Sequence, residues 1–598
     1  MAKESFEDEE VIRILNKNFI SVKLDRDERP DVDRRYQQAA AAMGSGGGWP
    51  LSVFLTPDRR PFFGGTYFPP EDTRVRPGFK KVLRSVLEFY KTHRDEISVY
   101  ADRLIHTLAP EPTVEEKLNE SALDGALSSV LAEFDPQNGG FGLSGHGPKF
   151  PLSGAIEFLL ERYALTGNEA ARLAAKKTLT SMAKGGFHDQ LGGGFHRYST
   201  DGAWIVPHFE KMADDNSWLL KNYTDAYSLL GDEYFREVAE GIISFIKEVL
   251  SEPEGGFYAS QDADVTPDDE GGYFTWTEDE LKAALDEDEF GAISIHLFHE
   301  AGSMHHNPSK RVLFVSEEIK DVAEKLGLDE PSARELIKNA TGKLLEARRK
   351  RQMPFVDRAL YTSLNGMLSA AYLKAYGVLK DDYLRDFALK TIEKIIGMNY
   401  RDGALYHSGN VKAMIEDYVY LVEALISAYE ATGEAAYLSR GQGLMDDCVK
   451  KFWDDRDSGF FDSEGEVLGI RLKAVEDIPH PSANSVAALL LIKLHYITGH
   501  QRYMELAEKT LGVFAERARE MGLHASYYYC ALNACFDMII LTTGSPELAR
   551  TASSVTLPYS TIIYRKGDGT ATPCFRQRCY EPIGSAGALE KFLREPLR

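Results

Sequence analysis

Three histidines, His188, His196 and His208, lie close together in one polar stretch of the chain. A neutral imidazole can take or give a proton near pH 7. Two such rings on opposite sides of a sugar would abstract and return a carbon-bound proton, which is the chemistry of an epimerase. The alternative is that the rings only hydrogen-bond the loop backbone. We predict that His208 and His188 are catalytic and that His196, Arg197 and Glu210 bind the substrate.

Carboxylates mark the start of two further polar segments. Asp262 and Asp264 in SQDAD follow a glycine-rich turn, whereas Glu416 and Asp417 in IEDY precede an apolar segment. Hydrolysis of a glycosidic bond needs two carboxyl groups, about 5–5.5 Å apart or about 6.5–9.5 Å apart. For Glu416 and Asp417 the alternative is a favourable charge at a helix N-terminus. We predict that Asp262 and Glu416 are catalytic and that Asp264 and Asp417 bind the substrate.

Other side chains in these segments are suited to holding a sugar. Trp204 and Tyr418 offer flat faces for stacking, although packing in the core is the alternative for each. The remaining predicted substrate contacts are Asp357, Arg358, Asn365, His480 and Asn484. The histidines have neither H-x-x-x-H spacing nor cysteine neighbours, so we predict no metal and no cofactor.

Composition restricts the partners of the chain. Its 598 residues carry a formal net charge of −23, so no surplus of Lys and Arg is available to replace the counterions of a nucleic acid. No apolar run is long enough for a membrane span, and MAKESFEDEE lacks the apolar core of a secretion signal. The cysteines are few and odd in number. We therefore expect a cytoplasmic protein that binds a small, sugar-like molecule and neither nucleic acid nor membrane.

A repeat sets the elements that must position these groups. Turns of the GGF type recur about every 60 residues, with one interval lengthened by an insertion of about 90 residues. These turns end at Phe141, Phe195, Phe257, Leu405, Phe460 and Leu523. A second landmark precedes most turns, at Gly167, Gly231, Lys380, Gly433 and Gly499. Amphipathic segments flank each landmark, which suits a helix C-cap followed by a tight turn and a second helix.

Six helical hairpins can form either an open solenoid or a closed ring. The unequal loops favour closure, and we predict a mainly α fold, an (α/α)6 toroid over residues 120–535 with an insertion at about 262–356. The loops after the GGF-type turns carry nearly all the polar groups described above. Ring closure would bring these loops to one end, beside the N-termini of the inner helices, and would form a cleft there.

Long motifs then identify a family. The segments DQLGGGFHRYSTDGAWIVPHFEKMADDN, GGFYASQDAD, MIEDYVYLVEALISAYE and PSANSVAALLLIKL resemble the spermatogenesis-associated protein 20-like family. ESFEDEEVIRILNKNFISVKLDRDERPDVDRRY and GGWPLSVFLTPDRRPFFGGTYFPPED extend the resemblance over nearly the whole chain. It implies a thioredoxin-like domain joined to a six-hairpin, glycosidase-like toroid.

The resemblance also exposes a departure. In the family, a CHWCHVM stretch carrying the thioredoxin-like cysteine pair precedes ESFEDEE, whereas Met1 falls here at the Met of that stretch. No C-x-x-C occurs in the sequence, so dithiol chemistry is not expected from this chain. We expect a truncated or misassigned start.

The remaining N-terminal sequence predicts a truncated thioredoxin-like α/β domain over residues 1–110. Its expected elements are helices over 6–18, 30–42 and 78–108 and strands in FISVKLD, LSVFLTP and PFFGGTYFP, with APEPTVEEKL as the linker. Pro50, at the position of the cis proline of thioredoxin-like folds, is predicted to be cis.

Residues 536–598 predict a small C-terminal α/β appendage. Cys574 and Cys579 resemble the family's terminal pair, and we expect them to be buried thiols, with a disulfide as the alternative. We interpret the whole chain as a carbohydrate-active protein of the isomerase, epimerase or glycoside-hydrolase type. The alternatives are a non-catalytic ligand-binding or quality-control protein, or a thioredoxin-type oxidoreductase in a form that retains the upstream cysteine pair.

Overall fold

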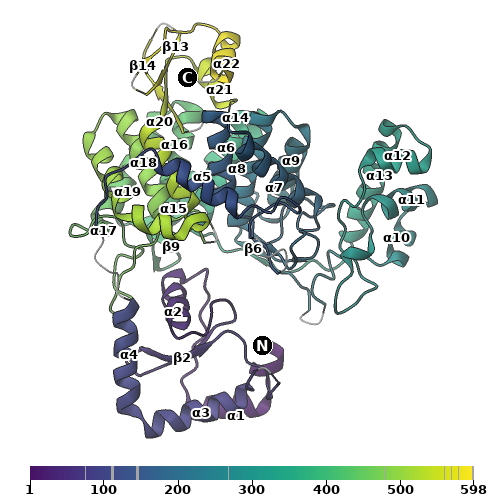
Figure 1. The fold of residues 1–598 in the computed structure, drawn as a ribbon, viewed down its shortest axis with the longest axis vertical. Coiled ribbons are helices and arrows are strands. Elements are labelled where there is room, and N and C mark those ends of the chain that lie inside the picture. Colours follow the sequence, from purple (N-terminus) through teal and green to yellow (C-terminus); the bar gives the residue numbers. More distant parts are fainter. Residues whose placement is uncertain are drawn as a thin grey trace.

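A ring of helices forms the centre of the molecule, with a domain at each end of its axis and a lobe at its side (Figure 1). The computed structural model describes residues 1–74, 76–108, 114–142, 147–266, 269–478, 480–555, 557, 559–567, 569–576 and 578–595. Across those ranges, no helix combines the length and apolarity that crossing a bilayer would require.

Six inner helices close the ring. They are α6 (Ser153–Thr166), α8 (Ala213–Leu230), α14 (Thr362–Leu379), α16 (Ile415–Thr432), α18 (Ala483–Thr498) and α20 (Ser526–Asp537). Each contacts the next in this order, and α20 contacts α6. The outer helices are α5 (Ala122–Ala132), α7 (Glu169–Lys184), α9 (Glu233–Val249), α15 (Asp382–Asn399), α17 (Ala435–Phe452) and α19 (Gln501–Met521). The predicted (α/α)6 toroid is therefore confirmed, and the open solenoid is excluded.

The landmark residues form the tight turns between inner and outer helices. Each of the five is a left-handed C-cap whose N–H bonds back to the last turn of its inner helix. Gly167, Gly231, Gly433 and Gly499 take this conformation without a Cβ clash. Lys380 takes it too, at φ 61°, although a left-handed residue with a side chain costs about 1–2 kcal/mol.

Three of the GGF-type turns are held by one repeated contact, which we call the turn clamp. An asparagine of the following inner helix accepts from the N–H of the turn phenylalanine and donates to its carbonyl. The three clamps are Phe195–Asn216, Phe257–Asn365 and Phe460–Asn484. All three asparagines are buried, so the clamp satisfies backbone groups that water cannot reach.

A lysine–aspartate ion pair supports three of the GGF-type turns, those that end at Phe141, Phe195 and Phe460. Each lysine Nζ donates to the aspartate that opens the turn and to a carbonyl inside it, as in Lys211 with Asp189 at 2.7 Å and with the Gly193 carbonyl at 2.8 Å. Lys149–Asp135 and Lys473–Asp454 repeat the arrangement. Asp189 also accepts from Arg348 of the insertion at 2.8 Å.

Short strands tie the polar loops together at the end of the ring where the inner helices begin. β3 (Tyr198–Ser199) pairs with β4 (Pro207–His208), and β8 (Tyr400–Arg401), β9 (Ala404–Ser408) and β10 (Val411–Lys412) form a second sheet. A third sheet joins β5 (Lys211–Met212), β6 (Ser260–Gln261) and β7 (Val356–Asp357) from three different loops. We call this end of the ring the loop end.

The N-terminal domain lies against the loop end (Figure 1). Its elements are a π-helix (Ala2–Phe6), α1 (Glu9–Asn18), α2 (Pro30–Ala42), β1 (Ser52–Leu55), β2 (Pro61–Gly65), α3 (Phe79–Thr92) and α4 (Arg94–Leu108). The Trp49–Pro50 peptide is cis, as predicted. The helix predicted over 78–108 is interrupted at His93. The linker prediction falls partly on residues 109–113, which lie outside the described residues.

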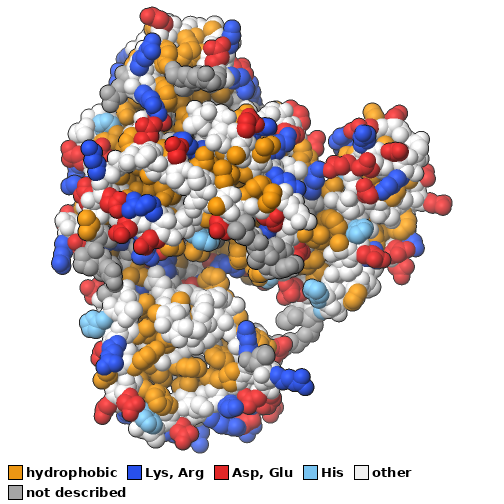
Figure 2. All heavy atoms as spheres, in the orientation of Figure 1, with side chains coloured by type: hydrophobic (Ala, Val, Ile, Leu, Met, Phe, Trp, Pro, Cys, Tyr) orange, Lys and Arg blue, Asp and Glu red, His pale blue; other side chains and the backbone are white. Residues whose placement is uncertain are grey.

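One predicted strand of this domain is wrong. Residues 19–25, all of them described, run as irregular backbone. Ile20 is 95% exposed and Val22 81% exposed, so the alternation of apolar residues buries no face here. Figure 2 shows apolar side chains gathered on the surface of this domain. A strand is stable only beside a partner strand, and the β1–β2 pair lies elsewhere in the domain.

The insertion forms the lobe at the side of the ring, around its own apolar core. Its helices are α10 (Glu278–Ala284), α11 (Glu287–His296), a short 3-10 helix (Glu300–Gly302), α12 (Ile319–Leu326) and α13 (Glu330–Arg348). Trp276 is buried in this core.

The C-terminal unit covers the other end of the ring (Figure 1). It comprises β11 (Ile539–Thr543), α21 (Pro546–Ser553), β12 (Ser560–Tyr564), β13 (Ala571–Phe575), β14 (Arg578–Cys579) and α22 (Ala586–Arg594). β11 is parallel to β12 and antiparallel to β13. Cys574 and Cys579 form a disulfide between the paired strands β13 and β14, so the expected thiols are corrected to the alternative. We call this the appendage end.

Candidate functional site

His208 lies in a polar group at the loop end. Its Nε2 is 3.8 Å from a carboxylate oxygen of Glu210, and its Nδ1 is 3.3 Å from one of Glu270. The ring stacks on Tyr198, with centroids 5.1 Å apart. Arg197 donates to Glu210 at 2.9 Å. The structure thus brings His208, Arg197 and Glu210 together in one group.

Carboxyl groups surround this cluster. Burial, then the charge of Asp214, raises the pKa of Asp215 well above its usual value. Burial also raises the pKa of Asp262, with Glu210 and Asp357 adding repulsion. Carboxyls that are crowded and partly desolvated hold protons more tightly, because their charged forms repel and lose hydration. Groups of this kind are able to act as acids near neutral pH.

Asp264 belongs to the same acidic surroundings. Burial raises its pKa, and the nearby charge of Glu270 adds to the effect, whereas His208 opposes it. Asp357 contacts the loop itself by accepting from the Ala359 N–H at 2.9 Å. Arg358 places its guanidinium 5.7 Å from the ring centroid of Tyr258.

The N-terminal domain covers part of this end with charged contacts. Arg34 pairs with Glu416 at 2.7 Å. Arg35, whose side chain is 0% exposed, makes a bidentate ion pair with Asp462 at 2.7 and 2.8 Å. Glu416, predicted to be catalytic, is therefore engaged by the neighbouring domain.

The domain also brings an acid and an aromatic ring to the loop end. Burial raises the pKa of Asp27 to about 6, and Asp214 and Glu210 add repulsion. Trp49, beside the cis peptide, lies under the Arg197 guanidinium at 5.3 Å. The loop end is thus built from both domains.

Asp417 and His407 form a buried pair beneath this interface. One oxygen of Asp417 accepts from His407 Nδ1 at 2.8 Å and from the Ser363 N–H, while the other accepts from the Met414 N–H. His407 Nε2 donates to the Asp27 carbonyl at 2.7 Å. Burial alone would lower the pKa of His407, but Asp417 raises it to about 9. Asp417 is therefore a helix cap and a partner for a charged histidine.

Four predicted site residues lie inside the framework. Burial lowers the pKa of His188 to about 4 and that of His196 well below its usual value, so both rings are neutral. His196 Nδ1 donates to the Phe209 carbonyl at 2.8 Å. Trp204 donates to the Gly139 carbonyl, and Tyr418 packs on Phe452 between α16 and α17.

The residues at the starts of α14 and α18 also have framework contacts. Asn365 and Asn484 form turn clamps, as described above. His480 Nδ1 is 3.0 Å from the Tyr420 hydroxyl. The structure therefore separates a surface group around His208, Glu210 and Asp262 from the other predicted contacts.

Three aromatic side chains cross the bore of the ring below the loop end. Trp218 packs edge-on against Tyr527 at 5.2 Å and against Tyr420 at 6.4 Å. We call this layer the aromatic floor. Trp218 lies one helical turn below Asp214 on α8, and the next turn carries Lys221, whose Nζ lies 3.8 Å from the Trp218 ring centroid.

Curated relatives decide the family. A human protein named spermatogenesis-associated protein 20 is 34% identical over 99% of this chain and 85% of its own length. The mouse protein of the same name is 33% identical over 95% of this chain and 79% of its own length. The chain belongs to the spermatogenesis-associated protein 20 family. The family model Thioredox_DsbH, described as a protein of unknown function (DUF255), matches residues 1–109.

Solved structures are only distantly similar to this spermatogenesis-associated protein 20 family member. A D-mannose isomerase is 10% identical over 70% of this chain and 98% of its own length, with a TM-score of 0.44. A cellobiose 2-epimerase of Bacillus thermoamylovorans is 10% identical over 66% of this chain and 87% of its own length, with a TM-score of 0.43. A GH76 α-mannanase of Bacteroides thetaiotaomicron is 13% identical over 69% of this chain and 94% of its own length, with a TM-score of 0.42. The ring assignment rests on the helix contacts themselves.

Several groups at the loop end of this family member were missed by the sequence analysis. Asp214 and Asp215 were available in the motif MADDN, directly before an apolar helix. Asp27, Arg34 and Arg35 belong to the charged run DRDERPDVDRR. That run carries no signal for what it contacts, because its partners lie about 400 residues further along the chain.

The described residues also bear on metal and thiol chemistry in this family member. Within the described ranges, no three His, Cys, Asp or Glu side chains are grouped as metal ligands. Burial raises the pKa of Cys448 and of Cys530, and it raises that of Cys535 to about 12. The three thiols therefore remain protonated near neutral pH and are poor nucleophiles.

Proposed function

We propose that this chain is a carbohydrate-active protein that binds a sugar-like ligand at the loop end of the ring. The observation that carries the proposal is the group of acids with raised pKa beside the ion-paired Glu210. Acid–base catalysis on glycosides uses one protonated and one charged carboxyl. We assign the protonated role to Asp215, whose pKa burial raises, and the charged role to Glu210, which pairs with Arg197. Trp49, which is half exposed and lies beside Arg197, is the aromatic side chain that we expect to contact the sugar.

Carboxyl chemistry is favoured over proton exchange between two histidines. His196 is buried and already bonded to a backbone carbonyl, and both ring nitrogens of the half-buried His188 are inaccessible, so both rings are neutral. Neither ring is available on the side of a ligand opposite His208. We therefore propose a reaction of the glycoside-hydrolase type, in which Asp215 donates the proton and Glu210 is the charged carboxylate. His208 and Asp262 contact the ligand.

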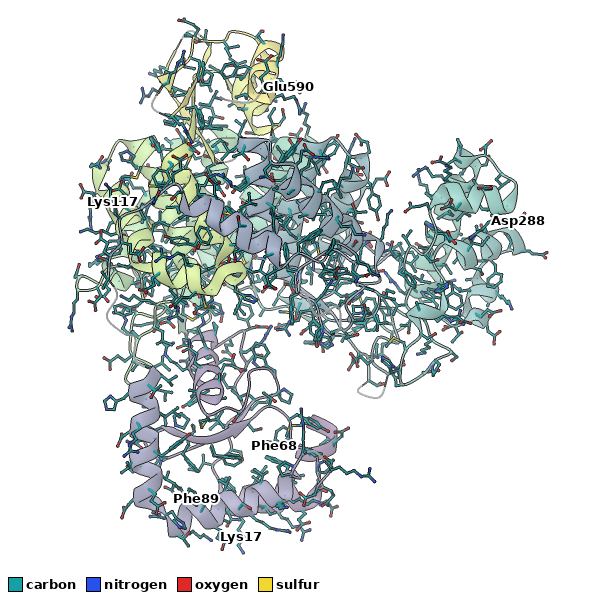
Figure 3. The ribbon with its side chains drawn as sticks, viewed as in Figure 1. Lys17, Phe68, Phe89, Lys117, Asp288 and Glu590 are labelled. Carbon is teal, nitrogen blue, oxygen red and sulfur yellow. A yellow bond between two sulfur atoms is a disulfide. The ribbon has the colours of Figure 1, made fainter. Side chains whose placement is uncertain are left out.

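A panel of aryl glycosides and oligosaccharides tests this proposal with the full chain. Hydrolysis is followed by release of the chromophore or of new reducing ends. Asp215→Asn and Glu210→Gln should each lower kcat by about 10²–10⁴-fold, the contribution typical of acid–base groups. Asp288→Asn, an exposed acid on the side lobe labelled in Figure 3, is the matched control and should leave kcat unchanged.

Two results would overturn the assignment. One is normal turnover by both variants with unchanged thermal unfolding. The other is uptake of deuterium at a sugar carbon without hydrolysis, because that exchange is the mark of an isomerase or epimerase.

A second candidate function is ligand binding without turnover. The observation that favours it is the cover over the loop end, where Arg34 and Arg35 engage Glu416 and Asp462. A sugar screen by thermal shift separates the two functions, since a binding protein would be stabilised by a hit that it never converts. A thioredoxin-type reaction is not proposed for this sequence, which contains no C-x-x-C.

A further inference from the structure

A cavity of about 580 Å³ lies in the bore of the ring, below the aromatic floor. Its wall is formed by α6, α8, α14, α16 and α18, with Tyr527 of the floor at one side. The C-terminal unit covers its outer end through α21, β12 and α22, and Glu590 on that rim is labelled in Figure 3. The volume lies within the range of about 300–1,000 Å³ that is typical of small-molecule sites.

The lysines of this cavity already have acidic partners. The ion pairs are Lys221–Glu423 at 2.7 Å, Lys374–Asp225, and Lys493–Glu430 at 3.2 Å. Thr561 of β12 also donates to Glu430, at 2.9 Å, which fixes the C-terminal unit to the wall. A ligand must therefore be recognised by the charged groups of the wall that these ion pairs do not include.

Two glutamates remain without a cation. Glu157 and Glu161 lie one turn apart on α6, are 7% and 8% exposed, and line the cavity. Neither forms an ion pair with any residue that the structure describes. One oxygen of each, Oε2, has no hydrogen-bond partner among the described groups. Leaving a buried carboxyl unpaired is costly, because it loses hydration without compensation.

The surroundings of the two glutamates raise the pKa of both carboxyls and so favour their protonated forms. Burial raises the pKa of Glu157 to about 7, Asp225 and Glu423 add to the effect, and Lys374 and Lys221 oppose it. Burial and the neighbouring Glu157 raise the pKa of Glu161 well above its usual value. A cation placed between the two carboxyls would remove both the repulsion and the unpaired oxygens.

The rest of the wall defines the class of that cation. Eight acids and five bases line the cavity and its rim, so the potential favours positive charge. Leu160, Leu373, Ile426 and Leu490 supply apolar surface between the charged groups. An ammonium on a short hydrocarbon stem matches this combination, because three N–H donors meet the carboxyls and the stem meets the leucines.

We propose that the bore of the ring binds a small aliphatic amine, with its ammonium group held between Glu157 and Glu161. The site is separate from the loop end and independent of the function proposed there. Tyr527 of the aromatic floor lies at one side of the cavity, and α21, β12 and α22 form its rim at the appendage end.

Isothermal titration of the full chain with putrescine and with spermidine at pH 7.5 tests the site. Butane-1,4-diol, which has the same stem as putrescine and no charge, is the matched ligand and should not bind. Glu157→Gln should weaken amine binding about tenfold or more, as expected for loss of a charge-assisted hydrogen bond. Glu287→Gln, an exposed acid on the side lobe, should not change the affinity. Equal affinity in Glu157→Gln, or binding of the diol as tight as that of the amines, would overturn the proposal.

A second measurement does not depend on the variant folding. Binding of an ammonium ionises a carboxyl that is protonated in the free protein, so the complex must release a proton near pH 7. Titrations of the unaltered chain in two buffers of different ionisation enthalpy measure this release. Proton release supports the site, whereas binding without it, or no binding of either amine, rejects it.

Discussion

The two ends of the ring neutralise their buried charges in different ways. At the loop end, Arg34 and Arg35 come from the N-terminal domain and pair with Glu416 and Asp462 of the ring. At the appendage end, lysines of the inner helices pair with acids of neighbouring inner helices, as in Lys221–Glu423. The pairs at the loop end therefore depend on a second domain, whereas the lysine pairs at the appendage end lie within the ring wall.

This difference shows at which end of the ring the position of a neighbouring domain affects the buried charges. Any movement of the N-terminal domain would expose buried charge at the loop end, so docking and ligand access are linked there. The appendage end lacks that link, and its charge imbalance lies in the wall itself, at Glu157 and Glu161. Four predictions test the contrast.

The largest effect is expected from Arg35→Met. It removes the buried partner of Asp462 and leaves an uncompensated carboxylate, which should lower the free energy of unfolding by about 3–5 kcal/mol. Urea unfolding measures the loss, and trypsin should cleave the linker region faster. The exposed Arg13→Met is the control. Adding Asp462→Leu to Arg35→Met should recover much of the stability. If neither Arg35→Met nor the double variant changed the rate of cleavage, the loop end would not depend on the N-terminal domain as described.

The pH dependence of the loop end should follow His407. Its pKa in the folded chain, about 9, lies above its unfolded value, so the stabilisation is complete below about pH 6.5 and is lost as the pH rises through 9. The free energy of unfolding should fall by about 3 kcal/mol over that window. Urea melts at pH 6.5, 8 and 9.5 measure the slope, which His407→Asn should abolish. An unchanged slope in the variant would contradict the assignment.

At the appendage end, stability should also fall as the pH rises, but removing the titrating group by Glu157→Gln should stabilise the chain. The pKa of Glu157 is raised to about 7, so ionisation destabilises the fold progressively as the pH rises from about 4.5 through 7. The substitution should therefore stabilise the chain by about 2 kcal/mol at pH 8 and have little effect at pH 5. Thermal unfolding at the two pH values checks this. Destabilisation at pH 8 would show that the carboxylate is already compensated.

The smallest effect concerns the turns at the appendage end. Lys380→Gly should stabilise the chain by about 1 kcal/mol, because glycine adopts the left-handed C-cap without strain. Gly499→Ala, where φ is 77°, should destabilise by a similar amount. The denaturant midpoints of the two variants should shift in opposite directions. A shift of both midpoints in the same direction would contradict the prediction.

The ring was predictable because its signal is local and repeated. Gly167 and its equivalents mark helix ends whatever the tertiary context, and the equal spacing implies a common unit. The turn clamps were also encoded, since Asn216, Asn365 and Asn484 follow similar turns. Two of these asparagines were assigned to the ligand, because a polar residue at a helix start suggests function unless its backbone partner is known.

The candidate site was predictable only in part. His208, Glu210 and Asp262 lie in one surface group, whereas the ring nitrogens of His188 are inaccessible and His196 is buried. Charged residues inside apolar helices, such as Glu157 in AIEFLLERY and Lys374 in AAYLKAY, were a signal for the polar bore that the sequence analysis did not use. Their pairing depends on the angular position of each helix in the ring, which sequence periodicity does not fix.

The turn clamp of Phe257 has an evolutionary consequence. Its asparagine, Asn365, lies 108 residues away, and the whole side lobe is contained between the two. The clamp closes the turn as tightly as the other two, at 2.7 Å against 2.8 Å. Because the clamp joins the two ends of the inserted segment, a longer segment at this point extends outward from the ring. The third hairpin can therefore accept new sequence without a change in the packing of the neighbouring hairpins.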